Sequence, residues 1–205
     1  MAKEKLPFDA LRQYLPDKTY ELVMPLIHQH KVHLTVTRER QTKLGDYRNA
    51  HAGRNHRISV NGNLNKYSFL ITLLHELAHL LAYEQHGHTI QSHGREWKNI
   101  FAGVLRTFLQ HHIFPTDIAN EIQASLHNPA ASSCAEEGLQ RILMNYDKRR
   151  PGMKRVEELD GGKNFSIANG RLFQKGERIK KRYKCIELAT GKIYLFSPVY
   201  EVMEI

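Results

Sequence analysis

The feature that most limits how this chain can fold is a long apolar segment with two histidines and a glutamate inside it. We expect this segment to form a helix that lies in the core, because its apolar residues recur at helical spacing and cover much of the surface. Polar side chains in such surroundings need partners, since an unpaired polar group is costly to bury. The apolar residues are Phe69, Leu70, Leu73, Leu74, Leu77, Leu80 and Leu81.

The polar residues of this segment are His75, Glu76 and His79, which form an HExxH motif. Residues four apart lie on the same face of a helix, so the two histidines can bind one metal ion from the same side. Three protein ligands and a water are typical of a catalytic zinc site, in which the glutamate takes a proton from that water. In a chain with 13 histidines the motif can also arise by chance, and the plain alternative is a pair of hydrogen-bonded core histidines.

The third ligand would come from the residues around the end of the helix, which we expect at Gly87. Ala82 excludes the HExxHxxGxxH pattern, because it stands where that pattern has its glycine. Spacing favours His93 over Glu96 only slightly and leaves the choice open. The candidates are His86, His88, His93 and Glu96.

A family resemblance narrows this choice. Residues 75–98, HELAHLLAYEQHGHTIQSHGREWK, resemble the signature of the SprT family of zinc metallopeptidases, in which a short HG(R/K)EW segment follows the HExxH helix. The resemblance implies that His75, His79 and His93 bind one zinc ion per chain and that Glu76 is the catalytic residue. The family includes the animal enzyme Spartan, which degrades proteins crosslinked to DNA. The resemblance is close over residues 47–101 and looser on either side.

The resemblance also implies an α+β fold. We expect residues 1–147 to form a zincin-like metallopeptidase domain, with helices, a small sheet and the HExxH helix at its active site. Residues 32–36 and Arg57–Asn61 alternate apolar and polar side chains, which is typical of strands. We expect Arg57–Asn61 to be an edge strand that pairs with the substrate backbone. The plain alternative for this segment is an ordinary internal strand.

Two further helices are predicted after the motif. Residues 94–111 show an amphipathic pattern that places Trp97 in the core. A capping box formed by Ser133 and Glu136 predicts a helix that ends near Tyr146.

The positive charge of the chain is concentrated in residues 148–184, which contain 13 Lys and Arg against 4 Asp and Glu. The excess of +9 equals the formal net charge of the whole chain, so the other residues sum to zero. Such a run favours nucleic acid first and acidic lipid second, whereas a solvated charged face is the plain alternative. We expect DNA contacts in this segment, with Lys180, Lys181 and Arg182 as candidate residues.

Residues 148–163 are expected to form a basic linker and residues 164–205 a small β-rich module with turns at Asn169-Gly170 and Thr190-Gly191. In SprT relatives this region often resembles a zinc ribbon with two Cys pairs, but here Cys185 is its only cysteine. One thiolate cannot close a structural zinc site, so we expect a metal-free module held by apolar side chains. These are Phe165, Phe173, Ile186, Tyr194 and Phe196.

The composition also bears on the compartment. No segment has the run of about 18 uncharged apolar residues that a membrane span requires, and no signal peptide is visible. The two cysteines, Cys134 and Cys185, are too few for a disulfide framework and fit a reducing cytoplasm.

Together these features predict a zinc-dependent endopeptidase of SprT type that acts on DNA-associated or DNA-crosslinked proteins. The alternative is a DNA-binding accessory or stress-response protein whose zinc site has little or no proteolytic activity. Three ligands with Glu76 beside them argue against this alternative, because a structural zinc site usually closes its fourth position with protein. A non-proteolytic zinc hydrolase is disfavoured only by the resemblance.

Overall fold

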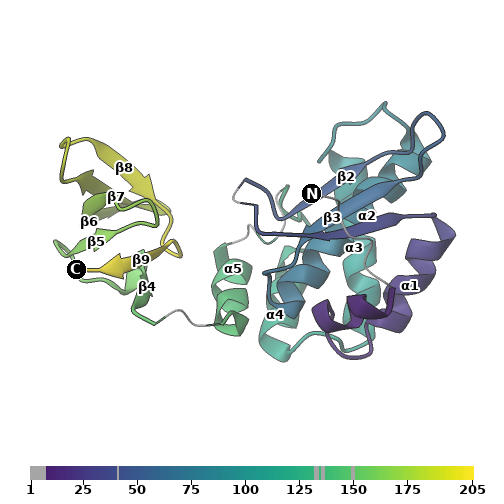
Figure 1. Cartoon of the computed structure of the whole chain (residues 1–205), viewed down its shortest axis with the longest axis horizontal. Helices are drawn as coiled ribbons and strands as arrows, with labels where there is room; N and C mark the ends of the chain where they lie inside the picture. The colour runs from purple at the N-terminus through teal and green to yellow at the C-terminus, as the bar shows by residue number, and fades with distance from the viewer. Residues whose placement is uncertain (1–7, 41, 132–133, 135–136, 149–150) are drawn as a thin grey trace. The chain divides into compact units, whose positions relative to one another are not determined.

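The computed structural model describes residues 8–40, 42–131, 134, 137–148 and 151–205. The chain divides into two compact units, residues 1–147 and 148–205, which are taken one at a time (Figure 1). Helices and strands are both present, so the mixed composition predicted from the sequence is confirmed.

The first unit contains a three-stranded sheet and a group of helices around one apolar core. Its strands are β1 (His33–Thr37), β2 (Gly45–Arg48) and β3 (Arg57–Asn61). Its helices are η1 (Phe8–Tyr14), α1 (Tyr20–Gln29), α2 (Lys66–His86), α3 (Arg95–Gln110), α4 (Thr116–Ser125), α5 (Glu137–Leu143) and η2 (Met144–Tyr146).

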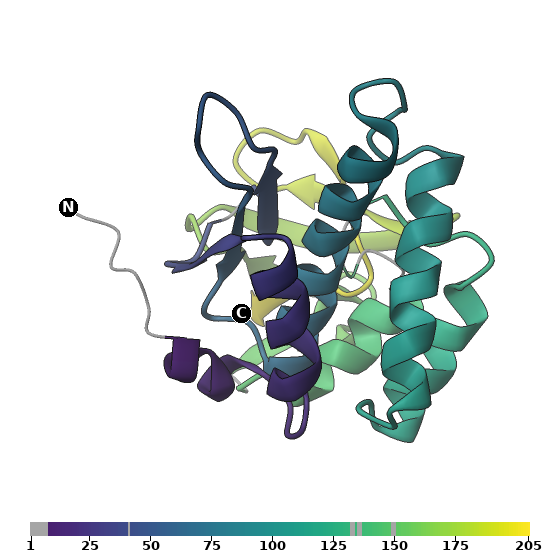
Figure 2. The same cartoon turned by 90° about the vertical axis from the view of Figure 1, so that its right-hand side faces the viewer.

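The HExxH motif lies on α2, which is buried between the sheet and α3 (Figure 2). The helix begins after Asn65, whose side-chain oxygen accepts hydrogen bonds from the backbone amides of Tyr67 (3.1 Å) and Ser68 (2.9 Å). These bonds satisfy amides that the first turn of a helix leaves unpaired. The helix ends at Gly87, as predicted, where a φ of +62° favours glycine.

β3 is the central strand of the sheet, because it pairs with β1 in parallel on one side and with β2 in antiparallel fashion on the other. The prediction that Arg57–Asn61 forms a free edge is therefore wrong. The alternation in this segment reflects burial of Ile58 and Val60 on one face of the sheet and carries no information about pairing. Among the described strands, β2 has the unpaired edge that lies next to α2.

The remaining predictions for this unit have mixed outcomes. Trp97 is fully buried on α3, as predicted. Ser133 and Glu136, the predicted capping box, lie outside the described residues. The helix expected after them is α5, and η2 extends it to Tyr146. Within the part of the chain that the structure describes, no helix is long and apolar enough to cross a membrane.

The second unit is a six-stranded sheet, in the order β4-β9-β5-β6-β7-β8, with its own apolar core. The short helix η3 (Val156–Glu158) follows the first strand. The strands are β4 (Met153–Arg155), β5 (Asn164–Ser166), β6 (Leu172–Ile179), β7 (Arg182–Glu187), β8 (Ile193–Phe196) and β9 (Glu201–Glu204).

Residues 153–163 are part of this unit, which corrects the prediction of a basic linker over 148–163. β4 pairs with β9, and the side chains of Val156 and Leu159 are buried in the core of the unit. The sequence prediction relied on the basic residues of this segment and overlooked Val156 and Leu159, whose side chains attach it to the core.

The prediction that Ile186 belongs to this core is wrong, because its side chain is 41% exposed. Side chains alternate along a strand, and on β7 the inward positions are taken by Cys185 and Glu187. Phe165, Phe173 and Phe196 are buried and Tyr194 packs against them, as predicted (all four are in the same cluster).

Candidate metal centre

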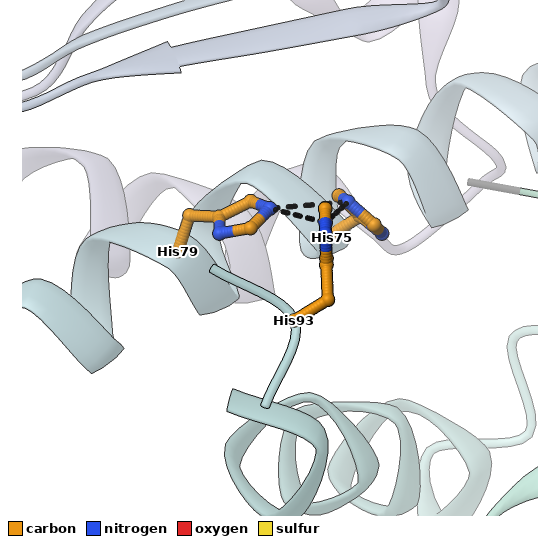
Figure 3. Close-up of side chains that lie close together, drawn as sticks. All are labelled: His75, His79 and His93. Carbon is orange, nitrogen blue, oxygen red and sulfur yellow. Dashed lines mark hydrogen bonds between the residues drawn. The ribbon is translucent and has the colours of Figure 1, made fainter. Parts of the chain in front are cut away.

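Three imidazole rings converge on one point beside α2 (Figure 3). His75 and His79 lie one turn apart on α2, and His93 comes from the loop that precedes α3. The Nε2 atoms are 3.2 Å apart for His75 and His79, 3.0 Å for His79 and His93, and 3.3 Å for His75 and His93. No other group of three His, Cys or carboxylate side chains among the described residues is placed to hold a metal ion.

Hydrogen bonds alone cannot satisfy this triangle. A ring nitrogen is either a donor or an acceptor, so at least two of the three Nε2 atoms are alike and cannot bond to each other. A tetrahedral metal with bonds of about 2.0–2.1 Å, as for zinc, holds its ligand nitrogens about 3.3–3.4 Å apart. The observed separations of 3.0–3.3 Å are close to this value. The residues present therefore fit a bound metal ion.

The electrostatic surroundings keep these histidines neutral. Burial, together with the neighbouring histidines, lowers the pKa of His75 to about 3. Burial and the proximity of His93 lower the pKa of His79 to about 4. The pKa of His93 is also lowered, by burial and by Lys98. A neutral imidazole presents a lone pair, which is the form that binds a metal.

Trp97 forms an apolar floor under the three histidines. The centroid of its ring lies 4.7 Å from the ring centroid of His75, 5.0 Å from that of His79 and 4.7 Å from that of His93. The indole is fully buried, so it excludes water from this side of the site. Its packing with Phe101, at 5.0 Å between centroids, joins the floor to the core face of α3.

Glu76 lies next to the first histidine and is only 6% exposed. Burial, with a smaller contribution from Asp46, raises the pKa of its carboxyl to about 8. The backbone amide of Tyr47 donates a hydrogen bond to this carboxyl and favours its ionised form. A cation held by the three histidines would favour the carboxylate further, because opposite charges within a few ångströms attract.

Gly45 makes room for this carboxyl. A Cβ atom on Gly45 would lie 2.3 Å from Oε1 of Glu76 and 2.8 Å from Cγ2 of Thr72. Both distances are shorter than any ordinary contact, so only glycine lets β2 approach the helix this closely.

Tyr47 connects three parts of the site. Its backbone amide binds Glu76, and its ring stacks on His79 with an interplanar angle of 5° and 6.4 Å between centroids. Its hydroxyl lies 2.9 Å from Nδ1 of His56. That nitrogen also accepts a hydrogen bond from the amide of Ala50 at 3.2 Å, so it carries no proton and the Tyr47 hydroxyl is the donor.

A second layer of polar contacts holds this arrangement in place. Since Nδ1 of His56 is an acceptor, the proton is on Nε2, which faces Oε1 of Glu84 at 3.6 Å. The other oxygen of Glu84 binds Nδ1 of His30 at 2.7 Å. The chain from His30 to Tyr47 thus ties the end of α1 and the middle of β2 to the helix that carries the site.

The site opens into a cleft of about 480 Å³. Tyr83, His88 and Arg95, polar residues that follow the motif in the sequence, are not among the lining residues. Sequence reasoning missed Gly45 and Tyr47, because no motif marks them. The lining residues are Thr42, Lys43, Leu44, Gly45, Asp46, Tyr47, His75, Glu76, His79, Ser92, His93 and Ala131.

The other candidates from the sequence lie elsewhere. Glu96 is in the first turn of α3 and does not line the cleft. Lys180, Lys181 and Arg182 are in the second unit, at the turn between β6 and β7.

Comparison with protein-family models matches residues 11–119 to the SprT-like family. The match spans more than half of the 205 residues and includes the sheet, the three histidines and Glu76. Comparisons with curated proteins and with solved structures give no match.

The close approach of Gly45 to Glu76 can be tested by Gly45→Ala. We expect a loss of about 1–3 kcal/mol in the free energy of unfolding, because the added methyl group overpacks the contact. Gly103→Ala is the matched control: its Cβ would meet nothing within 4 Å, so the change should be neutral or stabilising. Urea unfolding measures both. Equal effects of the two substitutions would contradict the assigned contact.

Proposed function

The chain belongs to the SprT-like family, and from this premise we propose that it is a zinc-dependent endopeptidase of zincin type that cleaves proteins associated with DNA. The observation that carries the proposal is the convergence of His75, His79 and His93 beside Glu76 at the floor of a cleft. Three ligands leave the fourth position of a tetrahedral site for water or substrate, as catalytic zinc sites do.

In the proposed reaction, zinc would be held by the three histidines and would lower the pKa of a bound water and polarise the scissile carbonyl. Glu76 accepts the proton of that water on its carboxylate and delivers it to the nitrogen of the leaving amine. The hydrogen bond from the Tyr47 amide and the space above Gly45 hold the carboxylate in place for both transfers. Trp97 keeps water away from the buried side.

The unpaired edge of β2 is the surface we propose for the substrate backbone. This strand supplies Gly45, Asp46 and Tyr47 to the wall of the cleft, directly above Glu76. An extended peptide that adds to a strand edge is bound through its main chain, which gives affinity with little sequence preference. Such binding suits an enzyme whose substrates are varied proteins.

The proposed link to DNA rests on the turn between β6 and β7. Several basic residues of the run over 148–184 are occupied within the second unit: Arg171 pairs with Glu187 at 2.6 Å, and Lys175 is buried against backbone carbonyls. Lys180, Lys181 and Arg182 are exposed at the tip of a tight hairpin, where no ion pair is present among the described residues. These three remain the candidates for phosphate contacts.

The alternative function is a DNA-binding accessory protein with an inactive zinc site. The burial of Glu76 argues against this alternative. Burying a carboxyl to 6% exposure costs free energy of folding, and a catalytic role beside the metal site would account for that cost.

Glu76→Gln tests the catalytic assignment. We expect zinc to be retained and casein cleavage to fall by about 10²–10⁴-fold, since the amide cannot accept the proton. Glu96→Gln is the control, because Glu96 is near the site in sequence but does not line the cleft. Full cleavage by Glu76→Gln would mean another base or a contaminating protease. Absence of cleavage by the wild type would favour the accessory protein.

Metal content tests the ligand set. We expect one zinc per chain by elemental analysis, lost in His93→Ala because two histidines bind weakly, and retained in His88→Ala. Cys185→Ser should also leave the metal in place, since its thiol is buried in the core of the second unit. Two tightly bound metals, or loss of zinc with Cys185→Ser, would show that the second unit is a zinc module.

The basic turn is tested by replacing Lys180, Lys181 and Arg182 together with Gln. The slope of log K against log salt for a labelled DNA should fall by up to about three, because each phosphate contact contributes about 0.9. A chain that ends at Asp147 should bind DNA less tightly. Lys192→Gln, another exposed cation of the second unit, is the control. Unchanged affinity and slope in the triple variant would show that the turn is a solvated charged surface that does not contact DNA.

A further inference from the structure

The face of the first sheet that points away from α2 is entirely polar. Side chains alternate along β3, so Ile58 and Val60 enter the core while Arg57, Ser59 and Asn61 point outward. Cross-strand neighbours share a face, and the register places three rows there: His33, Arg57 and Arg48; Thr35, Ser59 and Asp46; Thr37 and Asn61.

This face is hollowed into a basin of about 580 Å³. Five basic and two acidic side chains line it, together with hydroxyl groups of threonine and serine. We call it the basic sheet face. Its charged residues are Arg38, Glu39, Arg40, Lys43, Asp46, Arg48 and Arg57.

The charges of the basic sheet face are only partly compensated. Asp46 pairs with Lys43 at 2.6 Å and with Arg48 at 3.0 Å. Within the described ranges, Arg38, Arg40 and Arg57 form no ion pair with a carboxylate. Three guanidinium groups on one face therefore give it a positive potential, although the residues outside 148–184 sum to zero charge.

Arg40 is fixed in place across the sheet. Its Nε donates to Oδ1 of Asn61 at 2.7 Å and its Nη1 to Oγ of Ser59 at 2.9 Å. Its Nη2 donates to the backbone oxygens of Leu44 at 3.2 Å and Ser59 at 3.3 Å. All these acceptors are neutral, so the positive charge stays on the face and its position is set before any ligand arrives.

Arg57 is short of an acceptor. Its Nε is buried, and in the part of the chain that the structure describes it has no hydrogen-bond partner. Because this nitrogen is closed to solvent, a ligand would meet the terminal nitrogens of the guanidinium, the side-chain group best suited to an oxyanion. Arg40 binds the side chains of Ser59 and Asn61, which lie two and four residues beyond Arg57 on the same face of β3.

We propose that the basic sheet face binds the phosphate backbone of duplex nucleic acid. The phosphates of a duplex form regular rows of negative charge along its backbone, which a face with several unpaired guanidinium groups complements. Among the described lining residues, Ile58 is the one apolar side chain and it is buried, so they offer no exposed apolar anchor for a peptide. Among the described residues that line it, none is Phe, Tyr or Trp, and the imidazole of His33 is its one ring for stacking single-stranded bases.

The basic sheet face lies beside the cleft that holds Glu76, so a duplex bound there would be close to the proposed active site. Along β2, Asp46 and Arg48 contribute to the basic sheet face, while Gly45 and Tyr47 line the cleft, and Lys43 and Asp46 border both. A duplex on this face would lie one strand away from Glu76. This consequence rests on the proposed function: a protein attached to the duplex is brought to the cleft by the duplex itself.

The test compares full-length Arg38→Gln/Arg57→Gln with the wild type in a salt titration of fluorescence anisotropy. With labelled duplex, we expect the log–log slope to fall by about 1.8, for two contacts at about 0.9 each. The matched control is Lys66→Gln/Arg106→Gln, which removes two charges from helices outside the face. Casein cleavage should stay unchanged in both variants, because neither touches the cleft.

Two results would overturn the proposal: an unchanged slope for duplex, or a loss of binding to polyglutamate with duplex binding intact, which would identify an acidic peptide. Thermal unfolding checks that Arg38→Gln/Arg57→Gln is folded. If it is not, Arg38→Gln/Arg48→Gln is used in its place. A wild type that binds duplex as expected but leaves casein intact would refute the peptidase and not this surface.

Discussion

The structure depends on the burial of a helix that carries polar groups into the core. His75 is 4% exposed and Glu76 is 6% exposed, although both lie on α2 among leucines. Such groups cost several kcal/mol unless they are paired, so each requires a partner from another segment. β2 supplies an amide to Glu76, the loop before α3 supplies His93, and α3 supplies Trp97. The sheet, α2 and α3 therefore meet at the site, where Nδ1 of His75 is still without a hydrogen-bond partner among the described residues.

Local spacing explains what the sequence predicted correctly. The helical conformation of the apolar segment and the burial of Trp97 follow from periodicity, and the end of the helix follows from Gly87. The pair His75 and His79 follows from the helix repeat. His93 needed the family resemblance, because the loop between the helices allows several candidates and only tertiary packing selects among them.

Partners distant in sequence explain what it could not predict. The sequence pattern of Arg57–Asn61 is the same for an edge strand and for a central strand. It is a central strand because β1, more than 20 residues away in the sequence, pairs with it. Cys185 and Ile186 are neighbours on β7 and point to opposite faces of the sheet. Which of the two faces the core is settled only when the sheet packs. Gly45 and Tyr47 carry no motif, and they matter because β2 crosses α2 at Glu76.

A count of charges along the sequence also fails to predict which cations are free to bind a ligand, because this depends on partners distant in sequence. A run of basic residues overstates the cations available to a ligand, because Arg171 and Lys175 are used within their own unit. Residues 1–147 contain 16 Lys and Arg against 14 Asp and Glu, a formal excess of only +2, yet the sheet brings Arg57 and Arg40 to one face without a carboxylate partner among the described residues. If both proposed surfaces bind phosphate and reach the same duplex, the second contact is intramolecular, and the chain binds more tightly than either surface would alone. Under that condition neither surface by itself would account for the affinity of the chain for nucleic acid.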